Sequence, residues 1–282
     1  MSDHSEDKLF TQERQQAILS YVETHKKATV AELCQLFKVS TGTIRNDLRD
    51  MEKRKLVTRT HGGVLIRSKT GLEMMATEKA VRNHDAKVEV ARLALEQIED
   101  GDTLLLDTGS TTLELAKLLN ERKGLSVITN DLQIALILEE FPGVVNLFII
   151  GGAVRQKLHC VIPFNRDSGL SELIIDKAFM GANGFTLKNG ATTPDVRQAN
   201  LKKEMIACAS NVILLVDSHK VGHDTFAKFA EVSDISILIT DTISEEARAS
   251  IESRGVMVIS GMKENAQDHE QMQSGGMKAV KE

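Results

Sequence analysis

Residues Thr29 to Val64 read TVAELCQLFKVSTGTIRNDLRDMEKRKLVTRTHGGV. Apolar residues recur at helical spacing in two short blocks of this stretch, from Ala31 to Phe37 and from Ile44 to Met51. Residues 38–40, which follow the first block, are expected to form the short turn between the two helices. A further helical pattern runs from Glu13 to Lys26. The stretch therefore predicts a three-helix unit that contains a helix-turn-helix.

The second helix of this pair directs polar side chains away from its apolar face. Arginine can contact guanine or phosphate and asparagine can pair with adenine, so this face suits a DNA major groove. A serine or threonine hydroxyl at the start of the helix can cap its first turn. The residues expected to serve DNA binding from this helix are Ser40, Thr41, Thr43, Arg45, Asn46 and Arg49.

The segment from Val57 to Arg67 alternates like a small β-hairpin. Gly62-Gly63 can adopt the positive φ angles of a two-residue turn. A hairpin directly after the helices predicts the wing of a winged helix. Arg59 and His61 would then also lie at the DNA.

This region could bind DNA or could be an ordinary solvated surface, as most basic runs are. The distribution of charge along the chain distinguishes the two. Residues 1–69 hold 13 Lys+Arg and 9 Asp+Glu and carry +4, whereas the rest of the chain holds 22 against 31 and carries −9. Within residues 45–69, 8 basic residues face 3 acidic ones. A cationic head on an anionic body favours phosphate contact over a passive surface.

Two motifs of this region resemble the DeoR-type bacterial regulators of sugar operons. The residues are TGTIRNDL at 41–48 and RTHGGV at 59–64. That family usually has two consecutive arginines in the recognition helix, whereas this chain has Arg45 and then Asn46, which affects the expected operator sequence. His61 resembles the wing histidine of the family.

The length of 282 residues allows a head of about 70 residues and a larger body with its own core. We expect a winged head at residues 1–69, a partly helical linker at 70–84, a sensor body at 85–262 and a polar, disordered tail at 263–282. The three widely spaced cysteines indicate reduced thiols without metal-ligand spacing. We expect no cofactor, no metal, no membrane partner and a cytoplasmic location.

Strand-like and helical runs alternate through the body, which predicts an α/β fold with a mainly parallel sheet covered on both faces. The expected strands are 103–107, 125–129, 145–150, 177–181, 212–217, 235–240 and 256–259. The expected helices are 85–98, 112–120, 132–140, 199–209 and 245–254.

Ligands of open parallel sheets bind beyond the carboxyl ends of the strands. The first such loop is rich in glycine and hydroxyl groups and precedes a helix, so it can bind a phosphate, although an ordinary capped turn has the same composition. Its candidate effector-binding residues are Asp107, Thr108, Gly109, Ser110, Thr111 and Thr112.

Further polar residues follow the other strands and would converge on one rim. Asp176 equally suits a loop-ordering role, and the lysines equally suit solvated surface positions. Neither a GxGxxG fingerprint nor a GxxxxGK[ST] motif occurs in these loops. The additional effector-binding candidates are Thr129, Asn130, Gly151, Gly152, Asp176, Asn183, Lys188 and Lys220.

The body, over about residues 85–260, also resembles the DeoR sensor domain, whose fold is similar to that of sugar-phosphate isomerases such as ribose-5-phosphate isomerase. This resemblance implies that Gly109-Ser110-Thr111 holds a phosphate. An isomerase also needs a carboxylate base. The isomerase sequence Gly-Ala-Asp-Glu is replaced here by an amide and a glycine, Asn183-Gly184, with Gln198 near a further acidic position and Asp195 as a possible substitute.

The sequence therefore predicts a non-enzymatic transcription regulator, a repressor of a carbohydrate-use operon. Its expected partners are operator DNA, a phosphorylated sugar or polyol that relieves repression, and further copies of itself in a dimer or tetramer. The alternative is an isomerase-like or deaminase-like enzyme that carries a DNA-binding head. The residues do not separate activation from repression.

Overall fold

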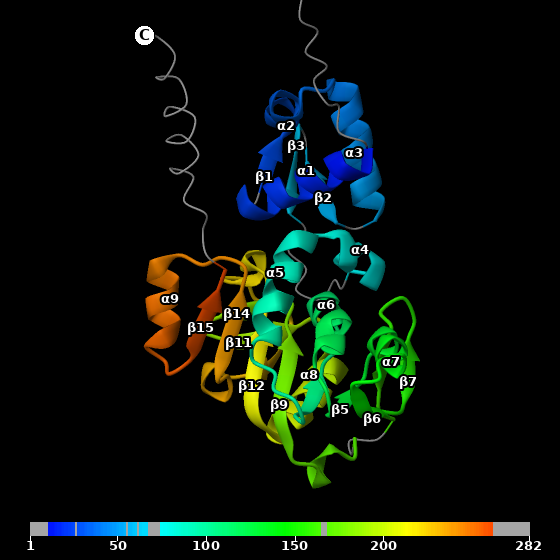
Figure 1. Cartoon of the computed structure of the whole chain (residues 1–282). Coiled ribbons are helices and arrows are strands. Elements are labelled where there is room, and N and C mark those ends of the chain that lie inside the picture. Colours follow the sequence, from blue (N-terminus) through cyan, green and yellow to red (C-terminus); the bar gives the residue numbers. More distant parts are fainter. Residues whose placement is uncertain are drawn as a thin grey trace, which may run out of the picture. The chain divides into compact units, whose positions relative to one another are not determined.

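The computed structural model describes residues 11–25, 27–54, 56–60, 62–66, 74–164 and 168–261. The chain divides into two compact units, 1–69 and 70–282 (Figure 1). The predicted tail, 263–282, lies outside the described residues, as do residues 70–73 of the predicted linker. None of the described helices has the length and apolar character needed to cross a membrane.

The first unit contains the three predicted helices, α1 (Thr11–His25), α2 (Val30–Phe37) and α3 (Thr41–Lys53). Thr29 and Glu32 form a reciprocal capping box at the start of α2, with the Glu32 amide donating to the Thr29 hydroxyl over 3.1 Å. Ser40 caps α3 by accepting from the Thr43 amide at 3.2 Å. These caps begin both helices of the helix-turn-helix.

Three short strands complete this unit in the order β1-β3-β2, namely β1 (Lys27–Thr29), β2 (Val57–Thr60) and β3 (Gly63–Ile66). Thr60 pairs with Gly63, so Gly63 belongs to β3 and the expected Gly62-Gly63 turn is wrong by one residue. Gly62 has φ +90°, whereas a Cβ on Gly63 would lie 2.5 Å from the Ala28 carbonyl oxygen. Gly63 is therefore required for close packing against β1, a strand that the sequence did not predict.

The second unit is built on a seven-stranded sheet in which every neighbouring pair is parallel (Figure 1). Its order is β15-β14-β12-β9-β4-β5-β6. Each of the seven predicted runs forms one of these strands, with small shifts at the ends. The bounds are β4 (Thr103–Leu106), β5 (Leu125–Thr129), β6 (Val144–Ile149), β9 (Ile175–Gly181), β12 (Ala209–Leu215), β14 (Ile237–Thr240) and β15 (Met257–Ser260).

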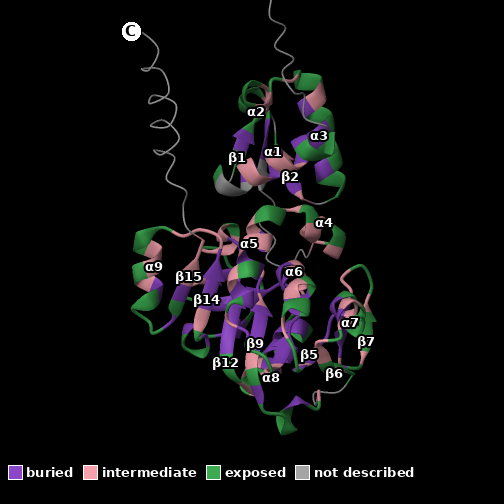
Figure 2. Cartoon of the chain, in the orientation of Figure 1, coloured by how far each residue is buried: buried purple, intermediate pink, exposed green. Residues whose placement is uncertain are grey.

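Helices cover both faces of this sheet, whose central strands are buried (Figure 2). One apolar core joins the sheet to α5, α6 and α7, and a second joins its other face to α8 and α9. A short helix, α4, lies in the predicted linker. The bounds are α4 (Ala76–Val81), α5 (His84–Leu95), α6 (Ser110–Leu118), α7 (Leu132–Glu139), α8 (Val196–Ala207) and α9 (Glu245–Glu252).

Several shorter elements of this unit were not predicted. They form an antiparallel hairpin, β7-β8, and a small antiparallel sheet in the order β10-β11-β13. Their bounds are β7 (Ala153–Arg155), β8 (Cys160–Ile162), β10 (Gly184–Thr186), β11 (Gly190–Thr193) and β13 (Ala227–Ala230). The 3₁₀ turns are η1 (Leu119–Glu121), η2 (Leu170–Glu172), η3 (Ser218–Lys220) and η4 (Val232–Asp234).

Candidate functional site

The α3 helix presents its predicted DNA-contacting residues to solvent. Five of them are exposed and one, Thr43, is half-buried; the exposed ones are Ser40, Thr41, Arg45, Asn46 and Arg49. Arg59 on β2 is half-buried, and its guanidinium lies 3.9 Å from the Glu52 carboxylate. His61 lies outside the described residues.

The opposite side of α3 is fixed to α1 by a buried polar network that the sequence did not indicate. Arg14 Nε donates to Asp47 Oδ2 at 2.6 Å, and Gln15 Nε2 donates to the other oxygen of Asp47 at 3.2 Å. Arg54 in turn donates to Gln15 Oε1 at 2.7 Å. Because a carboxylate buried without these donors would be costly, the network sets the rotation of α3 and thereby its exposed face.

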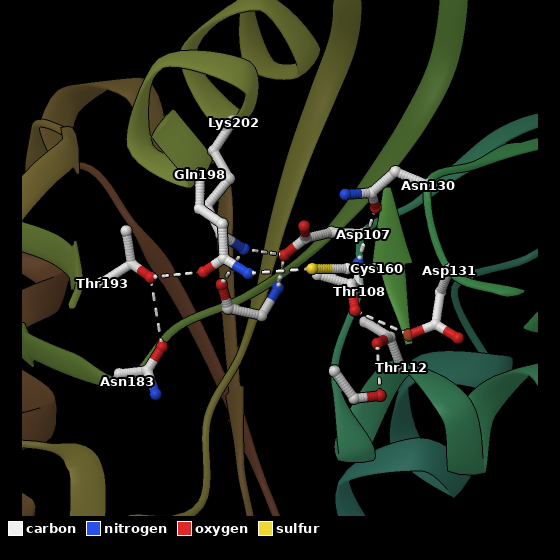
Figure 3. Close-up of polar contacts among 12 residues, drawn as sticks. Asp107, Thr108, Thr112, Asn130, Asp131, Cys160, Asn183, Thr193, Gln198 and Lys202 are labelled. Atoms are coloured by element: carbon white, nitrogen blue, oxygen red, sulfur yellow. Dashed lines mark hydrogen bonds and ion pairs between the residues drawn. The ribbon is translucent and has the colours of Figure 1, made fainter. Parts of the chain in front are cut away.

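In the second unit, the carboxyl end of β4 carries a fully buried aspartate, Asp107 (Figure 3). Its Oδ2 accepts from the Lys202 ammonium and from the Gly181 amide, the latter at 2.9 Å. Lys202 also donates to the Gly181 carbonyl oxygen at 3.0 Å. Burial raises the pKa of Asp107, and the Lys202 charge opposes that effect. These bonds join β4, β9 and α8 at one end of the sheet.

The helix α6 begins three residues after this aspartate, at Ser110. Its N-cap, Gly109, has no side chain to accept from the first-turn amides, unlike Asp131 of α7 and Asp195 of α8, which cap their helices. The Thr111 hydroxyl and Asp107 Oδ1 are both buried and have no hydrogen-bond partner within the described part of the chain. Free donors at a helix N-terminus and an unpartnered hydroxyl beside them suit an anion with hydroxyl groups.

The loops after β5 continue the same rim. Asn130 Oδ1 accepts from the Thr108 amide at 3.0 Å, while the Thr108 hydroxyl donates to Asp131 Oδ2 at 2.6 Å. The Thr129 hydroxyl accepts from the Asp131 amide at 3.1 Å, so Thr129 supports the loop from a fully buried position. Burial raises the pKa of Asp131 above its usual value, and the hydrogen bond from Thr108 offsets only part of this effect. The predicted candidates Thr108, Thr129 and Asn130 thus form one hydrogen-bonded group.

A second group faces Asp107 from β11 and α8 (Figure 3). The Thr193 hydroxyl lies 3.1 Å from Gln198 Oε1 and 3.3 Å from Asn183 Oδ1, and its one proton can serve one of them at a time. Gln198 Nε2 donates to the Cys160 sulfur at 3.3 Å. Amides and hydroxyls can bind the hydroxyl groups of a sugar in either direction. Of this group, only Asn183 was among the predicted site residues.

The two glycines after β6 differ in their roles. A Cβ on Gly152, which has φ +148°, would lie 2.1 Å from the Ile162 carbonyl oxygen. Gly152 is therefore needed for the close approach of β7 to β8, which places Cys160 at the rim. Gly151 is exposed and has open space around its Cα.

Lys220 lies at the carboxyl end of β12 in a separate polar cluster. Its ammonium is 3.3 Å from Asp217 Oδ2, and Asn83 donates to the other oxygen of Asp217 at 3.3 Å. Beside them, the ammonium of the buried Lys87 donates to the carbonyl oxygens of Lys79 and Arg82 and thereby caps the carboxyl end of α4. Burial and the nearby Lys220 charge lower the pKa of Lys87 to about 8.

Two predicted residues are not brought to this rim. Asp176 is exposed near the amino end of β9, where it accepts from the Thr103 amide at 2.8 Å, so it lies at the opposite end of the sheet. Lys188 is exposed in the turn between β10 and β11, away from the base of that hairpin. Neither expectation is met. Asp176 is the second residue of β9 and therefore lies at its amino end, and Lys188 belongs to a hairpin that was not predicted.

The possible substitute base, Asp195, is already engaged. It caps α8 by accepting from the Arg197 and Gln198 amides, and it pairs with Arg155 at 3.3 Å. Burial alone would raise the pKa of Asp195, but its hydrogen bonds and the arginines outweigh burial and hold the pKa below its usual value. A carboxylate stabilised in its charged form is a weak general base.

Two family models match the chain. The DeoR-like helix-turn-helix domain matches residues 14–70, and the DeoR C terminal sensor domain matches residues 82–242. Together with the winged helix and the parallel α/β body, these matches define a DNA-binding transcription regulator with a separate sensor domain.

Named relatives extend over nearly the whole chain. HTH-type transcriptional regulator GlpR of Haloferax volcanii is 32% identical over 89% of this chain and 98% of its own length. A putative aga operon transcriptional repressor of Escherichia coli O157:H7 is 31% identical over 88% and 93%, and the lactose phosphotransferase system repressor of Staphylococcus epidermidis is 32% identical over 79% and 88%. The chain belongs to the DeoR family of transcriptional regulators, and it is a regulator rather than an enzyme.

Among solved structures, ribose 5-phosphate isomerase A from Methanocaldococcus jannaschii is similar to part of this chain. The two are 20% identical with a TM-score of 0.37, over 49% of this chain and 55% of the isomerase.

Proposed function

We propose that this regulator represses a carbohydrate-use operon and that a phosphorylated sugar or polyol relieves repression by binding at the carboxyl edge of the sheet. The observation that carries the effector site is the uncapped start of α6 beside two buried, unpartnered oxygens, Thr111 Oγ1 and Asp107 Oδ1. An effector phosphate would accept from the first-turn amides of α6 and from the Ser110 and Thr111 hydroxyls.

The sugar end of the effector would lie between the two hydrogen-bonded groups of the rim. Asn130 and Asp131 approach this space from β5, and Asn183, Thr193 and Gln198 approach it from the other side. These side chains offer both donors and acceptors, which suits several adjacent hydroxyl groups. The rim is therefore proposed to select the polyol chain, while α6 holds the phosphate.

The same geometry provides no free carboxylate base at the proposed site. The position that resembles an isomerase acid is Asn183, an amide that cannot accept a proton at neutral pH. Asp195 is occupied as a cap and ion pair, and Asp107 is held by Lys202. The site can therefore bind a sugar phosphate without moving a proton between its carbons.

The winged head is proposed to bind operator DNA through Arg45, Asn46 and Arg49 in a major groove, with Arg59 on the wing beside the backbone. One head reads few base pairs, so we propose that the protein acts as a dimer or tetramer in the cytoplasm. Repression is favoured over activation because two of the relatives are named repressors.

Thermal stability of the purified chain against phosphorylated sugars and polyols, each beside its unphosphorylated form, tests this proposal. A ligand at about 100 times its dissociation constant adds about 2.7 kcal/mol to the native state. A rise in melting temperature with a phosphorylated compound, and none with its unphosphorylated form, is expected. Equal stabilisation by both forms would contradict a phosphate-binding role for α6.

A further inference from the structure

The short helix α4 is held at both ends by loops from the carboxyl edge of the sheet. At its amino end, the Ala76 amide donates to the Lys157 carbonyl oxygen at 2.9 Å. Just beyond its carboxyl end, the Asn83 side chain donates to Asp217 Oδ1 at 3.3 Å. Between these two attachments α4 packs against α6, whose start is the proposed phosphate site (Figure 1).

The attachment at the amino end leads to one side of the proposed effector site. Lys157 lies in the turn of the β7-β8 hairpin, which is hydrogen-bonded to the loop after β5. The Val161 amide donates to the Asn130 carbonyl oxygen at 2.8 Å, and Asn130 Nδ2 donates back to the Val161 carbonyl oxygen at 3.3 Å. The Leu132 amide donates to the His159 carbonyl oxygen at 2.9 Å. The amino end of α4 is thus connected to the Asn130 side of the rim.

The attachment at the carboxyl end leads to the other side of the site. Asp217 lies directly before η3, in the loop that follows β12. Beyond η3, the Gly222 amide donates to the Phe185 carbonyl oxygen on β10 at 2.8 Å. Asn183 immediately precedes β10. The carboxyl end of α4 is thus connected to the Asn183 side of the rim, so the helix bridges the two sides between which the effector is proposed to lie.

Backbone conformation marks both attachments. Among the described residues other than glycine, four have a positive φ, between +51° and +65°: Lys38, Asn83, Lys157 and His159. Asn83 follows α4, and Lys157 and His159 lie in the hairpin turn that holds its amino end. Residues in this conformation persist where the surrounding structure determines them, and they cluster at switch regions. Both attachments therefore depend on the contacts around them, which a rearrangement of the rim would change.

The chain runs from the DNA-binding head directly into α4. The last strand of the first unit, β3, ends at Ile66 and α4 begins at Ala76, so residues 67–75 form the covalent connection. A change in the direction or anchoring of α4 therefore changes the point from which this connection departs. Because α4 is attached to both sides of the proposed effector site, an effector that draws the sides together shifts the two attachments relative to each other.

We propose that α4 is a strap through which effector binding reaches the DNA-binding head. Without effector, the attachments at Ala76 and Asn83 hold α4 across the carboxyl edge of the sheet. Closure of the two sides around a phosphorylated sugar or polyol displaces these attachments and reorients the helix, and the connection to the head then departs from a different position. This inference rests on the proposed function and names the segment that carries its regulation.

Two substitutions each detach one end of the strap and leave the proposed effector and operator contacts in place. Ala76→Pro removes the amide donor at the first position of α4, where proline suits the helix and the preceding Met75 is already extended, with φ −64° and ψ 155°. Ala76→Ser is the matched control, because it keeps the amide. Asn83→Gly removes the donor to Asp217, and glycine accepts the φ of +51°. Circular dichroism and thermal unfolding establish that each variant is folded.

The measurement is the operator affinity of the full-length protein, by fluorescence anisotropy, with and without a phosphorylated compound. D-ribose 5-phosphate, D-fructose 1-phosphate, D-glucose 6-phosphate and glycerol 3-phosphate are tested separately on the wild type. The compound that weakens operator binding most is the probe for every variant. In the wild type and Ala76→Ser we expect weakening by about 5–150-fold, the usual range of allosteric coupling. In Ala76→Pro and Asn83→Gly the probe should change operator affinity by less than about twofold, although calorimetric titration shows that it still binds.

The outcomes separate this inference from the proposed function. A wild type that responds to none of the four compounds would overturn the proposed effector response and the strap with it. A wild type that responds, with the full response kept in either detaching variant, would overturn the strap alone. Loss of probe binding in those variants would also overturn it, because α4 would then belong to the effector site itself. Loss of the response with probe binding retained, and its persistence in Ala76→Ser, would support the strap.

Discussion

The ammonium of Lys202 on α8 binds the carboxylate of Asp107 at the end of β4, and both groups are buried. The two residues are 95 positions apart in the chain. This ion pair fastens the helix that supplies Gln198 to the strand that leads into α6. It therefore connects the two sides of the proposed effector site.

Lys202→Met should destabilise the second unit by about 3–5 kcal/mol, because it leaves Asp107 charged or protonated without its buried partner. Replacing both residues, with Lys202→Met and Asp107→Leu, should cost less than Lys202→Met alone. Urea unfolding of the wild type and of the two variants measures the difference. A double variant that is less stable than Lys202→Met would contradict this, because the unpartnered Asp107 carboxylate would then not be the main cost of losing Lys202.

Thr111→Val should weaken effector binding about tenfold while leaving the protein as stable as wild type or more so by about 1 kcal/mol. The reason is that the Thr111 hydroxyl is buried without a partner, so valine removes only a desolvated polar atom. The matched control is Thr112→Val, because the Thr112 hydroxyl donates to the Gly109 carbonyl oxygen at 2.9 Å. That change should lower stability by about 1 kcal/mol.

Calorimetric titration with the compound found by thermal shift, beside urea unfolding, distinguishes the two threonines. A Thr111→Val protein that binds this compound as tightly as wild type would place the phosphate elsewhere on the rim.

Arg45→Ala should weaken operator binding by about 1–3 kcal/mol, since an exposed arginine on the recognition helix loses its base or phosphate contact. Effector affinity should be unchanged, because Arg45 belongs to the first unit. Fluorescence anisotropy with labelled operator and calorimetry with effector measure the two affinities separately. An equal loss of operator affinity and effector affinity would contradict the assignment of DNA binding to the first unit and effector binding to the second.

The stability of the second unit should rise as pH increases from about 8 toward the pKa of an unfolded lysine, about 10.4. In this window, Lys87 is already losing its proton in the folded state, whereas the unfolded chain still holds it. The slope (unfolding free energy against pH) is therefore positive. With allowance for partial solvent access, the gain is about 1 kcal/mol.

Urea unfolding at several pH values, compared between wild type and Lys87→Met, isolates this contribution. The variant should lack the additional rise between pH 8 and 10. If both proteins show the same slope, the Lys87 ammonium stays charged through its bonds to the Lys79 and Arg82 carbonyl oxygens.

Periodic features of the sequence predicted the framework because burial follows local spacing. Ile44, Leu48 and Met51 recur at helical intervals and are fully buried, and the apolar run at Leu104–Leu106 is a fully buried strand. The three-residue strands β1 and β10 carry too few alternations to be recognised. The Gly62-Gly63 turn was misplaced for that reason, since the constraint on Gly63 comes from unpredicted β1.

The candidate site was predictable where each residue directly follows a strand, as Asp107, Thr108 and Asn130 do. Lys202 and Thr193 were not predicted as site residues, because their contacts arise only when α8 and β11 fold back over the sheet. Asp176 precedes the strand predicted from Lys177, so the rule about carboxyl ends should itself have excluded it. Lys188 was misplaced because the hairpin that carries it was not foreseen.

The proposed function requires that effector and operator binding are coupled, and operator affinity measured with and without effector tests this coupling. A duplex selected from a random library by the full-length protein serves as the operator, and its binding is followed by fluorescence anisotropy. We predict that a phosphorylated sugar or polyol weakens operator binding, and that operator weakens effector binding by the same factor. Tight binding of the phosphorylated compound with unchanged operator affinity would contradict the account.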